Sequence, residues 1–251
     1  MNEQLIFGRI AVLEALKSGR PIEKLYMLKP PYSGSIQQIA GIARSEGLSV
    51  QLVERPRLDQ LCEKGNHQGV AAIVAAYPYA EWTDILKAAR EKGEPPFLII
   101  CESIQDPHNL GAILRSADAA GVHGVIISRH HAVGLTEAVA KTAAGALEYV
   151  PVAQVTNIAQ LIENLKKEGI WTAAADMDGQ SVYQTDLTGP MAVVIGGEHE
   201  GVSRLVRERC DLTVSLPMKG QVTSLNASVA AGILMFEIAR QRGDFSAAAK
   251  K

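Results

Sequence analysis

The sequence has few of the residues from which disulfide frameworks and zinc sites are built. It contains three cysteines in 251 residues, and Cys62, Cys101 and Cys210 lie far apart, with no Cys-x-x-Cys pair. An odd number of isolated cysteines argues against a disulfide framework and against a zinc site. Because no other cluster of metal ligands is apparent in the sequence, we expect no bound metal.

Long apolar runs and a strong charge of one sign are also missing. No run approaches the roughly 20 apolar residues that a membrane-spanning helix needs, and the N-terminal residues lack the basic-then-apolar pattern of a signal peptide. The formal net charge is −2, which gives no overall basic signal for nucleic acid. We therefore expect a cytoplasmic protein that does not contact membranes.

Apolar residues make up 47% of the chain, which is enough for one large core or two modest ones. Residues 1–77 alternate short apolar strands with amphipathic helices, a pattern typical of a small α/β domain. Prolines and glycines interrupt the pattern at both ends of residues 78–96, where we expect a linker with one helix. A second domain is expected over residues 97–251.

The second domain is rich in alanine and contains apolar segments with almost no polar alternation. Strands of this kind are buried on both faces, and their alternation with helices predicts a parallel, doubly wound sheet. Ligands of such sheets bind at the carboxyl ends of the strands. The predicted strands cover residues 97–100, 124–128, 170–174, 191–195 and 212–216.

Two segments with unusual polar residues or glycines follow predicted strands. The first contains Asn109, at the expected N-cap of a helix, and Arg115 within that helix. The second contains Gly196, Gly197 and Glu198, where glycines let the backbone approach a ligand and a helix N-terminus can hold a polar group. Taken singly, a capped helix with a solvated arginine explains the first segment equally well, and a plain strand–turn–helix connection is the better explanation of the second.

A third segment, residues 216–230, also follows a predicted strand. Its Pro/Gly turn contains Leu216 and Met218, and Ser224, Leu225 and Asn226 precede an apolar helix. The exposed main-chain groups of such a turn suit a polar ligand. The alternative is a simple turn in which Ser224 caps the helix.

Taken together, the three segments resemble, in order and spacing, the motifs of the SpoU/TrmH branch of the SPOUT RNA methyltransferases over residues 96–243. Residues 6–16 and Asn66-His67-Gln68-Gly69-Val70 resemble the substrate-binding domain of RlmB-type 23S rRNA guanosine-2′-O-methyltransferases. The resemblance implies an α/β domain with a deep trefoil knot and a homodimer. It also implies that S-adenosylmethionine binds against Gly196, Gly197, Leu216, Met218 and Leu225.

The resemblance further implies a set of residues around the reacting ribose. These are Asn109, Arg115, Glu198, Ser224 and Asn226. Arg115 would act beside the cofactor of the partner subunit, either as a clamp that stabilises an alkoxide or as a base. Glu198 is either an anchor for its loop or a direct participant.

In the first domain, Arg9 and His67 are the candidate RNA contacts, and the alternative for His67 is a turn residue bonded to the local backbone. The expected activity is 2′-O-methylation of a guanosine ribose in 23S rRNA. A tRNA ribose 2′-O-methyltransferase is the alternative within the superfamily, and a non-catalytic RNA-binding or ribosome-assembly factor is the alternative outside enzymes. The Asn-His-Gln-Gly domain favours rRNA, because the tRNA branch lacks it.

Overall fold

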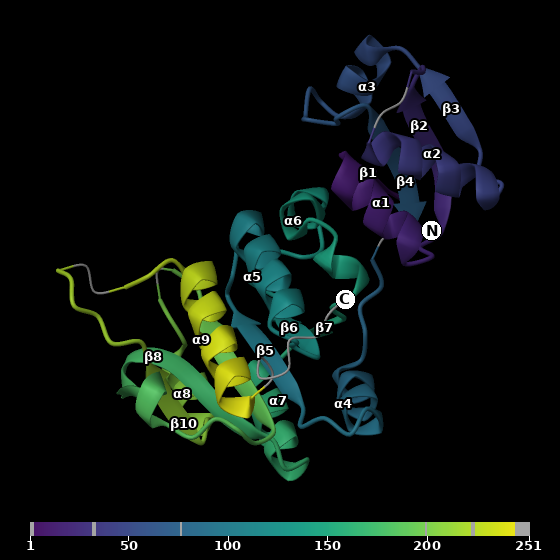
Figure 1. The fold of residues 1–251 in the computed structure, drawn as a ribbon. Coiled ribbons are helices and arrows are strands. Elements are labelled where there is room, and N and C mark those ends of the chain that lie inside the picture. Colours follow the sequence, from purple (N-terminus) through teal and green to yellow (C-terminus); the bar gives the residue numbers. More distant parts are fainter. Residues whose placement is uncertain (1–2, 32–33, 76, 199, 222–223, 244–251) are drawn as a thin grey trace. The chain divides into compact units, whose positions relative to one another are not determined.

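The computed structural model describes residues 3–31, 34–75, 77–198, 200–221 and 224–243. The chain forms two compact units (Figure 1). Unit 1 comprises Met1–Pro78 and Leu135–Tyr149, and unit 2 comprises Tyr79–Gly134 and Val150–Lys251. Residues 135–149 therefore belong to unit 1, although unit 2 surrounds them in the sequence.

Unit 1 contains a four-stranded sheet with strand order β1-β4-β2-β3. Strand β4 is antiparallel to both β1 and β2, whereas β2 and β3 are parallel. Helices α1 and α2 bury Val12, Leu16 and Ile39 in the same core cluster as Leu25 of β2. The elements are β1 (Glu3–Phe7), α1 (Arg9–Lys17), β2 (Ile22–Leu28), α2 (Ser35–Ser45), β3 (Val50–Val53), α3 (Arg55–Leu61), β4 (Val70–Ala75), α6 (Glu137–Ala143) and the 3₁₀ turn η1 (Ala146–Glu148).

Glu148 ties residues 135–149 to the rest of unit 1. Its carboxylate accepts hydrogen bonds from Ser18 Oγ at 2.8 Å and Tyr77 Oη at 2.7 Å, and it forms an ion pair with Arg20 at 3.2 Å. The Arg20 guanidinium also lies over the Tyr77 ring. Burial, reinforced by the Glu148 charge, raises the pKa of Tyr77, so this phenol stays protonated and keeps donating to Glu148.

Unit 2 is built on a six-stranded sheet in which every strand pair is parallel, with strand order β10-β8-β9-β5-β6-β7. The predicted parallel α/β sheet is confirmed, with β7 as a strand that the sequence pattern missed. Helices α5 and α9 lie side by side (Figure 1). The strands are β5 (Phe97–Glu102), β6 (Gly124–Ser128), β7 (Val152–Val155), β8 (Trp171–Ser181), β9 (Met191–Gly196) and β10 (Leu212–Ser215), and the helices are α4 (Trp82–Glu91), α5 (Pro107–Ala119), α7 (Ile158–Lys167), α8 (Arg204–Arg209), α9 (Ala227–Arg242) and the 3₁₀ turn η2 (Val182–Gln184).

The segment expected to be a linker, residues 78–96, contributes α4 to the core of unit 2. Ile85 and Leu86 of this helix are 3% and 2% exposed and belong to one cluster with the apolar face of α7. Ile85 also lies against Gly124, where a Cβ atom would come within 2.7 Å of it. The amphipathic pattern of α4 therefore reflects core packing. No helix in the described ranges is long and apolar enough to cross a membrane.

Candidate functional site

A cavity of about 490 Å³ lies where β9 and β10 end and beside residues 175–178 of β8, at the edge of the sheet where parallel α/β folds bind ligands. Its volume is in the range of small-molecule sites. Met218 and Leu225 line it and are 42% and 37% exposed, so they offer apolar surface to an occupant. All the residues predicted to bind the cofactor line this first cavity, namely Gly196, Gly197, Leu216, Met218 and Leu225.

The glycines of the loop after β9 are required by contacts between backbone segments. A Cβ atom on Gly196 would lie 1.9 Å from the carbonyl carbon of Gly201, and one on Gly197 would lie 2.5 Å from the Ser103 carbonyl oxygen. The Gly201 N–H donates to the Gly197 carbonyl at 2.9 Å, and Gly201 has a φ of +64°. The loop closes on itself, so these glycines shape the cavity wall as well as leaving room for a ligand.

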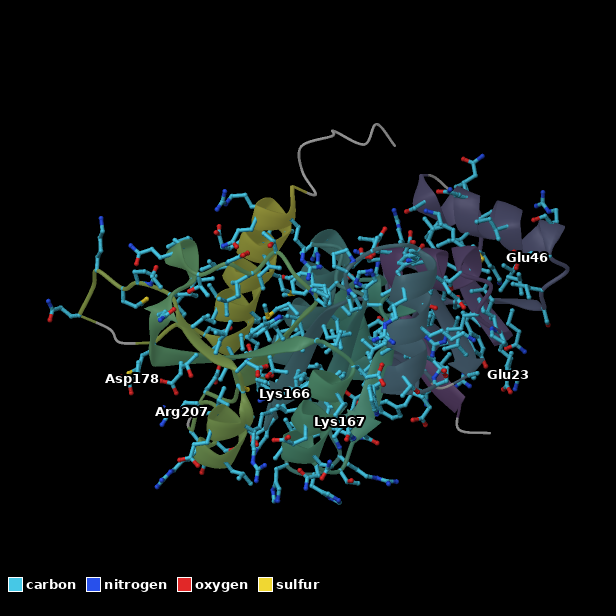
Figure 2. The ribbon with its side chains drawn as sticks, turned by 90° about the horizontal axis from the view of Figure 1, so that it is seen from below. Glu23, Glu46, Lys166, Lys167, Asp178 and Arg207 are labelled. Atoms are coloured by element: carbon cyan, nitrogen blue, oxygen red, sulfur yellow. The ribbon has the colours of Figure 1, made fainter. Side chains whose placement is uncertain are left out.

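The wall of the first cavity also includes a displaced part of β8. The pairing of β8 with β10 jumps from Ala174 to Gln180, so the residues between them leave the ladder. Asp176 and Asp178, from this stretch, line the cavity together with Arg207 of α8. Figure 2 labels the side chains of Asp178 and Arg207. Arg207 forms an ion pair with Asp176 at 3.0 Å, which links α8 to the displaced stretch.

Asn109 lies at a different position on its helix from the one expected. Asp106 is the N-cap of α5, because its side chain accepts from the His108 N–H at 2.8 Å and Pro107 follows it. Asn109 is instead within the first turn, is only 6% exposed, and donates through Nδ2 to Glu198 Oε1 at 2.8 Å. The first two motif segments are therefore joined by a hydrogen bond.

Asn226 joins the third segment to the same group. Its Nδ2 donates to Glu198 Oε1 at 2.7 Å and to Asn109 Oδ1 at 2.9 Å. Its Oδ1 accepts from the backbone N–H groups of Ser228 and Val229, so Asn226, and not Ser224, is the N-cap of α9. Because the helix N–H groups need an acceptor, the cap fixes which side of the amide faces Glu198.

A second cavity, of about 640 Å³, adjoins the first. Gly197, Glu198 and Glu200 line both cavities, so the loop after β9 forms a wall common to the two. Asn109 also lines the second cavity, while Ser224 lines only the first. The remaining lining residues of the second cavity are Ser103, Ile104, Gln105, Asp106 and His131.

Glu102 helps to hold the loop after β9 in place, and the sequence analysis did not predict this role. This residue ends β5, and its carboxylate accepts from the Ser203 N–H at 2.9 Å and from Ser203 Oγ at 2.7 Å. Ser203 in turn is the N-cap of α8. Glu102 thus anchors the far end of the loop that carries Glu198. Its position directly after a buried strand is the only sequence signal that would have indicated it.

Arg115 is not brought to the cavities within one chain. It is exposed on α5 and lines neither cavity, and among the described residues it has no ion-pair partner. The structure therefore assembles Asn109, Glu198 and Asn226 without it. Its expected role at the cofactor of a partner subunit stays a prediction.

In unit 1 the two predicted RNA contacts lie on adjacent segments. Arg9 donates through Nε to the Gln68 carbonyl at 3.1 Å, and its backbone N–H donates to the Gln68 side chain. His67 is 4% exposed, and its Nδ1 accepts from the Gly69 N–H at 2.9 Å while Nε2 donates to Asp59 at 3.0 Å. Both ring nitrogens are therefore engaged, which favours the interpretation of His67 as a turn-stabilising residue.

The described residues contain no group of three or more potential metal ligands. The three cysteines are free, and burial raises the pKa of Cys101 to about 12, which removes its thiolate at neutral pH.

Comparison with known proteins gives two family matches. Residues 96–236 match the SpoU rRNA Methylase family, and residues 5–80 match the family described as RNA 2′-O ribose methyltransferase substrate binding. YacO of Bacillus subtilis (strain 168), named as a TrmH family tRNA/rRNA methyltransferase, is 50% identical over 238 residues, covering 94% of this chain and 95% of YacO.

Two solved structures of methyltransferases and RNA-modifying enzymes are similar to this chain. The SpoU methyltransferase AviRb from Streptomyces viridochromogenes, crystallised in complex with the cofactor AdoMet, has a TM-score of 0.80 and 27% identity, with 96% of this chain and 91% of AviRb covered. The A. aeolicus TrmH/SpoU tRNA modifying enzyme has a TM-score of 0.54 and 28% identity, with 65% of this chain and 85% of that chain covered.

Proposed function

The chain belongs to the SpoU rRNA methylase family of S-adenosylmethionine-dependent RNA methyltransferases, and on that premise we propose that it methylates the ribose 2′-hydroxyl of a guanosine in 23S rRNA. The observation that carries the proposal is the junction of the three motif segments. Asn109, Glu198 and Asn226 are hydrogen-bonded to one another beside two adjoining cavities. One cavity suits the methyl donor and the other suits the acceptor.

The residues of the first cavity fit S-adenosylmethionine. Met218 and Leu225 present apolar surface for an adenine ring, and the glycine loop brings backbone polar groups to the same cavity. When bound, this cofactor supplies a methyl group already activated by a positively charged sulfur. The protein then has to align the acceptor oxygen with that methyl group, which is chiefly a matter of orientation.

Glu198 is placed to orient the acceptor. Two amide groups donate to its Oε1, so the carboxylate is held at the wall between the cavities. In our proposal its other oxygen accepts the hydrogen bond of the ribose 2′-hydroxyl and takes up that proton as the ribose oxygen is methylated. Arg115 of the partner subunit stabilises the developing alkoxide, since an arginine carries a positive charge and donors in a fixed fork.

This role for Arg115 requires a homodimer, and the surface of α9 supports one. Val229, Ile233 and Phe236 follow one another at helical spacing and are 49%, 37% and 42% exposed. They lie on the helix that packs beside α5, which carries Arg115. An exposed apolar stripe of this kind is typical of an interface between subunits. Ile233→Glu should give a monomer in sedimentation equilibrium, with methyl transfer lost.

We favour ribosomal RNA over tRNA as the substrate, because residues 5–80 match a substrate-binding family whereas the tRNA modifying enzyme covers only 65% of this chain. Arg9 remains our candidate RNA contact there, with His67 shaping its neighbour Gln68. We also propose that unit 2 contains a trefoil knot and that the protein acts on RNA in the cytoplasm.

The test is tritiated S-adenosylmethionine supplied with rRNA and, separately, tRNA from a strain lacking the gene. Label at the 2′-oxygen of one 23S guanosine is the expected result. Label in tRNA would favour the tRNA alternative. Label on a base, or none in either RNA, would overturn the proposal, and the second outcome would favour a non-catalytic RNA-binding factor.

A further inference from the structure

The second cavity differs from most RNA-contacting surfaces in the charge of its walls. Asp106, Glu198 and Glu200 line it, and no lysine or arginine is among its lining residues in the part of the chain described. A phosphodiester would meet like charge there. The base of a nucleotide is neutral and carries hydrogen-bond donors, so it is the part that such acidic walls can bind.

Asp106 is a carboxylate of this cavity that has a fixed orientation and an oxygen that the proposed reaction does not use. Its Oδ1 accepts from the His108 N–H at 2.8 Å, which holds the side chain as the cap of α5. Its Oδ2 has no hydrogen-bond partner among the described residues. By contrast, Glu198 is already held by the amides of Asn109 and Asn226.

We propose that the second cavity receives the base of the acceptor nucleotide and that Asp106 makes it selective for guanine. The inference rests on the proposed function, since the acceptor ribose must lie beside Glu198. Guanine is the base whose Watson–Crick edge presents two neighbouring donors, N1–H and the N2 amino group. Each carboxylate oxygen has two lone pairs, so Oδ2 accepts one of these donors and Oδ1 accepts the other beside the His108 N–H. Gln105 and His131, on the same cavity, carry N–H donors for the guanine O6.

The phosphates of the acceptor strand then lie outside the cavity, where a cation is available. Arg129 and His130 are exposed in the loop after β6 and directly precede His131. This loop is tied to the one after β5 by the Val133 N–H, which donates to the Ile104 carbonyl at 2.9 Å. Recognition of an unstacked base in a pocket with phosphate contacts at its rim is a common way to read single-stranded RNA.

Asp106→Asn tests the assignment without removing the cap, because asparagine caps helices as well as aspartate does. The variant replaces one acceptor of the guanine edge by a donor. Asp118→Asn, on the exposed face of the same helix and outside both cavities, removes the same charge and is the matched control. Melting temperature and S-adenosylmethionine affinity should be unchanged in both variants.

The kinetic measurement compares the RNA hairpin that the wild-type enzyme methylates with one that carries inosine, which lacks the N2 amino group, at the acceptor position. The wild type and Asp118→Asn should prefer guanosine by roughly 10- to 150-fold in kcat/KM, the range for losing one hydrogen bond to a charged group. Asp106→Asn should treat the two hairpins alike. If Asp106→Asn keeps the wild-type preference, the assignment of Asp106 is overturned.

A binding measurement separates this inference from the proposed function. The trinucleotides UGU and UIU are titrated into the full-length protein with S-adenosylhomocysteine present, and the His131 imidazole resonance is followed, assigned with His131→Gln. A shift with UGU that is weaker with UIU and absent in Asp106→Asn supports the base site even if no RNA is methylated. Equal shifts with both trinucleotides, or none, overturn it even if methylation is observed.

Discussion

Asn226 has two structural tasks, and two substitutions separate them. Its Oδ1 caps α9 by accepting from the Ser228 and Val229 N–H groups, while its Nδ2 donates to Glu198 and Asn109. Asn226→Ser keeps a capping side chain but loses the amide donor. Asn226→Ala loses both.

The expected cost follows from these contacts. Loss of the cap costs about 1 kcal/mol. The two donated hydrogen bonds contribute about 1 kcal/mol together, at the low end of the usual range, because Asn226 is exposed. Unfolding free energy should therefore fall by about 1 kcal/mol in Asn226→Ser and about 2 kcal/mol in Asn226→Ala, or roughly 2–4 °C and 4–8 °C in Tm.

The effect on catalysis should not follow this order. Both variants release Glu198 from one of its two amide donors, so both should lose a similar factor, about 10²-fold, in single-turnover methyl transfer. Tm is measured without cofactor, since ligand binding would raise it, and S-adenosylmethionine affinity is measured by calorimetry. A serine variant with the wild-type rate would refute the idea that the amide positions Glu198. Equal stability of the two variants would refute the capping role.

Three further expectations follow from other parts of the molecule. Arg115→Ala should abolish methyl transfer while S-adenosylmethionine affinity stays nearly unchanged, because its proposed task is to stabilise the alkoxide that forms on the acceptor; a near-normal single-turnover rate would contradict its assignment. Gly196→Ala should abolish cofactor binding and lower Tm, since the added Cβ atom would lie 1.9 Å from Gly201. The control is Gly41→Ala in α2, where a Cβ atom meets nothing within 4 Å, and it should raise the unfolding free energy by about 0.5–1 kcal/mol. A Gly196→Ala protein that binds cofactor normally would show that the loop can open. Burial lowers the pKa of His123, although the Glu94 carboxylate opposes this shift. The unfolded chain therefore binds the proton more readily than the folded protein does. The stability contributed by neutral His123 should be full above about pH 6.5 and fall below it. The Tm of the wild type should therefore drop more than that of His123→Gln between about pH 7.5 and 5.5, and parallel Tm curves would contradict this.

The sequence pattern predicted the parallel sheet of unit 2 because its strands are buried on both faces and read as unbroken apolar runs. It also singled out Gly196, Gly197, Leu216, Met218 and Leu225, which line one cavity in the structure, since loops that follow strands directly meet at one edge of the sheet. It missed β7, which is short, and it assigned the caps of α5 and α9 to Asn109 and Ser224. Each true cap lies within three residues of the expected one, and neighbouring polar residues give the same local signal.

The assignment of residues 135–149 was beyond any local pattern. Their docking on unit 1 depends on Glu148 meeting Ser18, Arg20 and Tyr77, which are at least 71 residues away in the chain. The same is true of α4, whose apolar face is visible in the sequence while the core that it joins is not.

The sequence by itself determined the family, the class of fold and the loops that line the two cavities, because these depend on local periodicity and on motif residues in a fixed order. Only the tertiary structure decided what those residues do to one another. Asn109 and Asn226 are 117 residues apart, yet both donate to the same oxygen of Glu198. The wall between the two cavities likewise exists only after the sheet has brought the ends of its strands together, because cavities are set by distance in space.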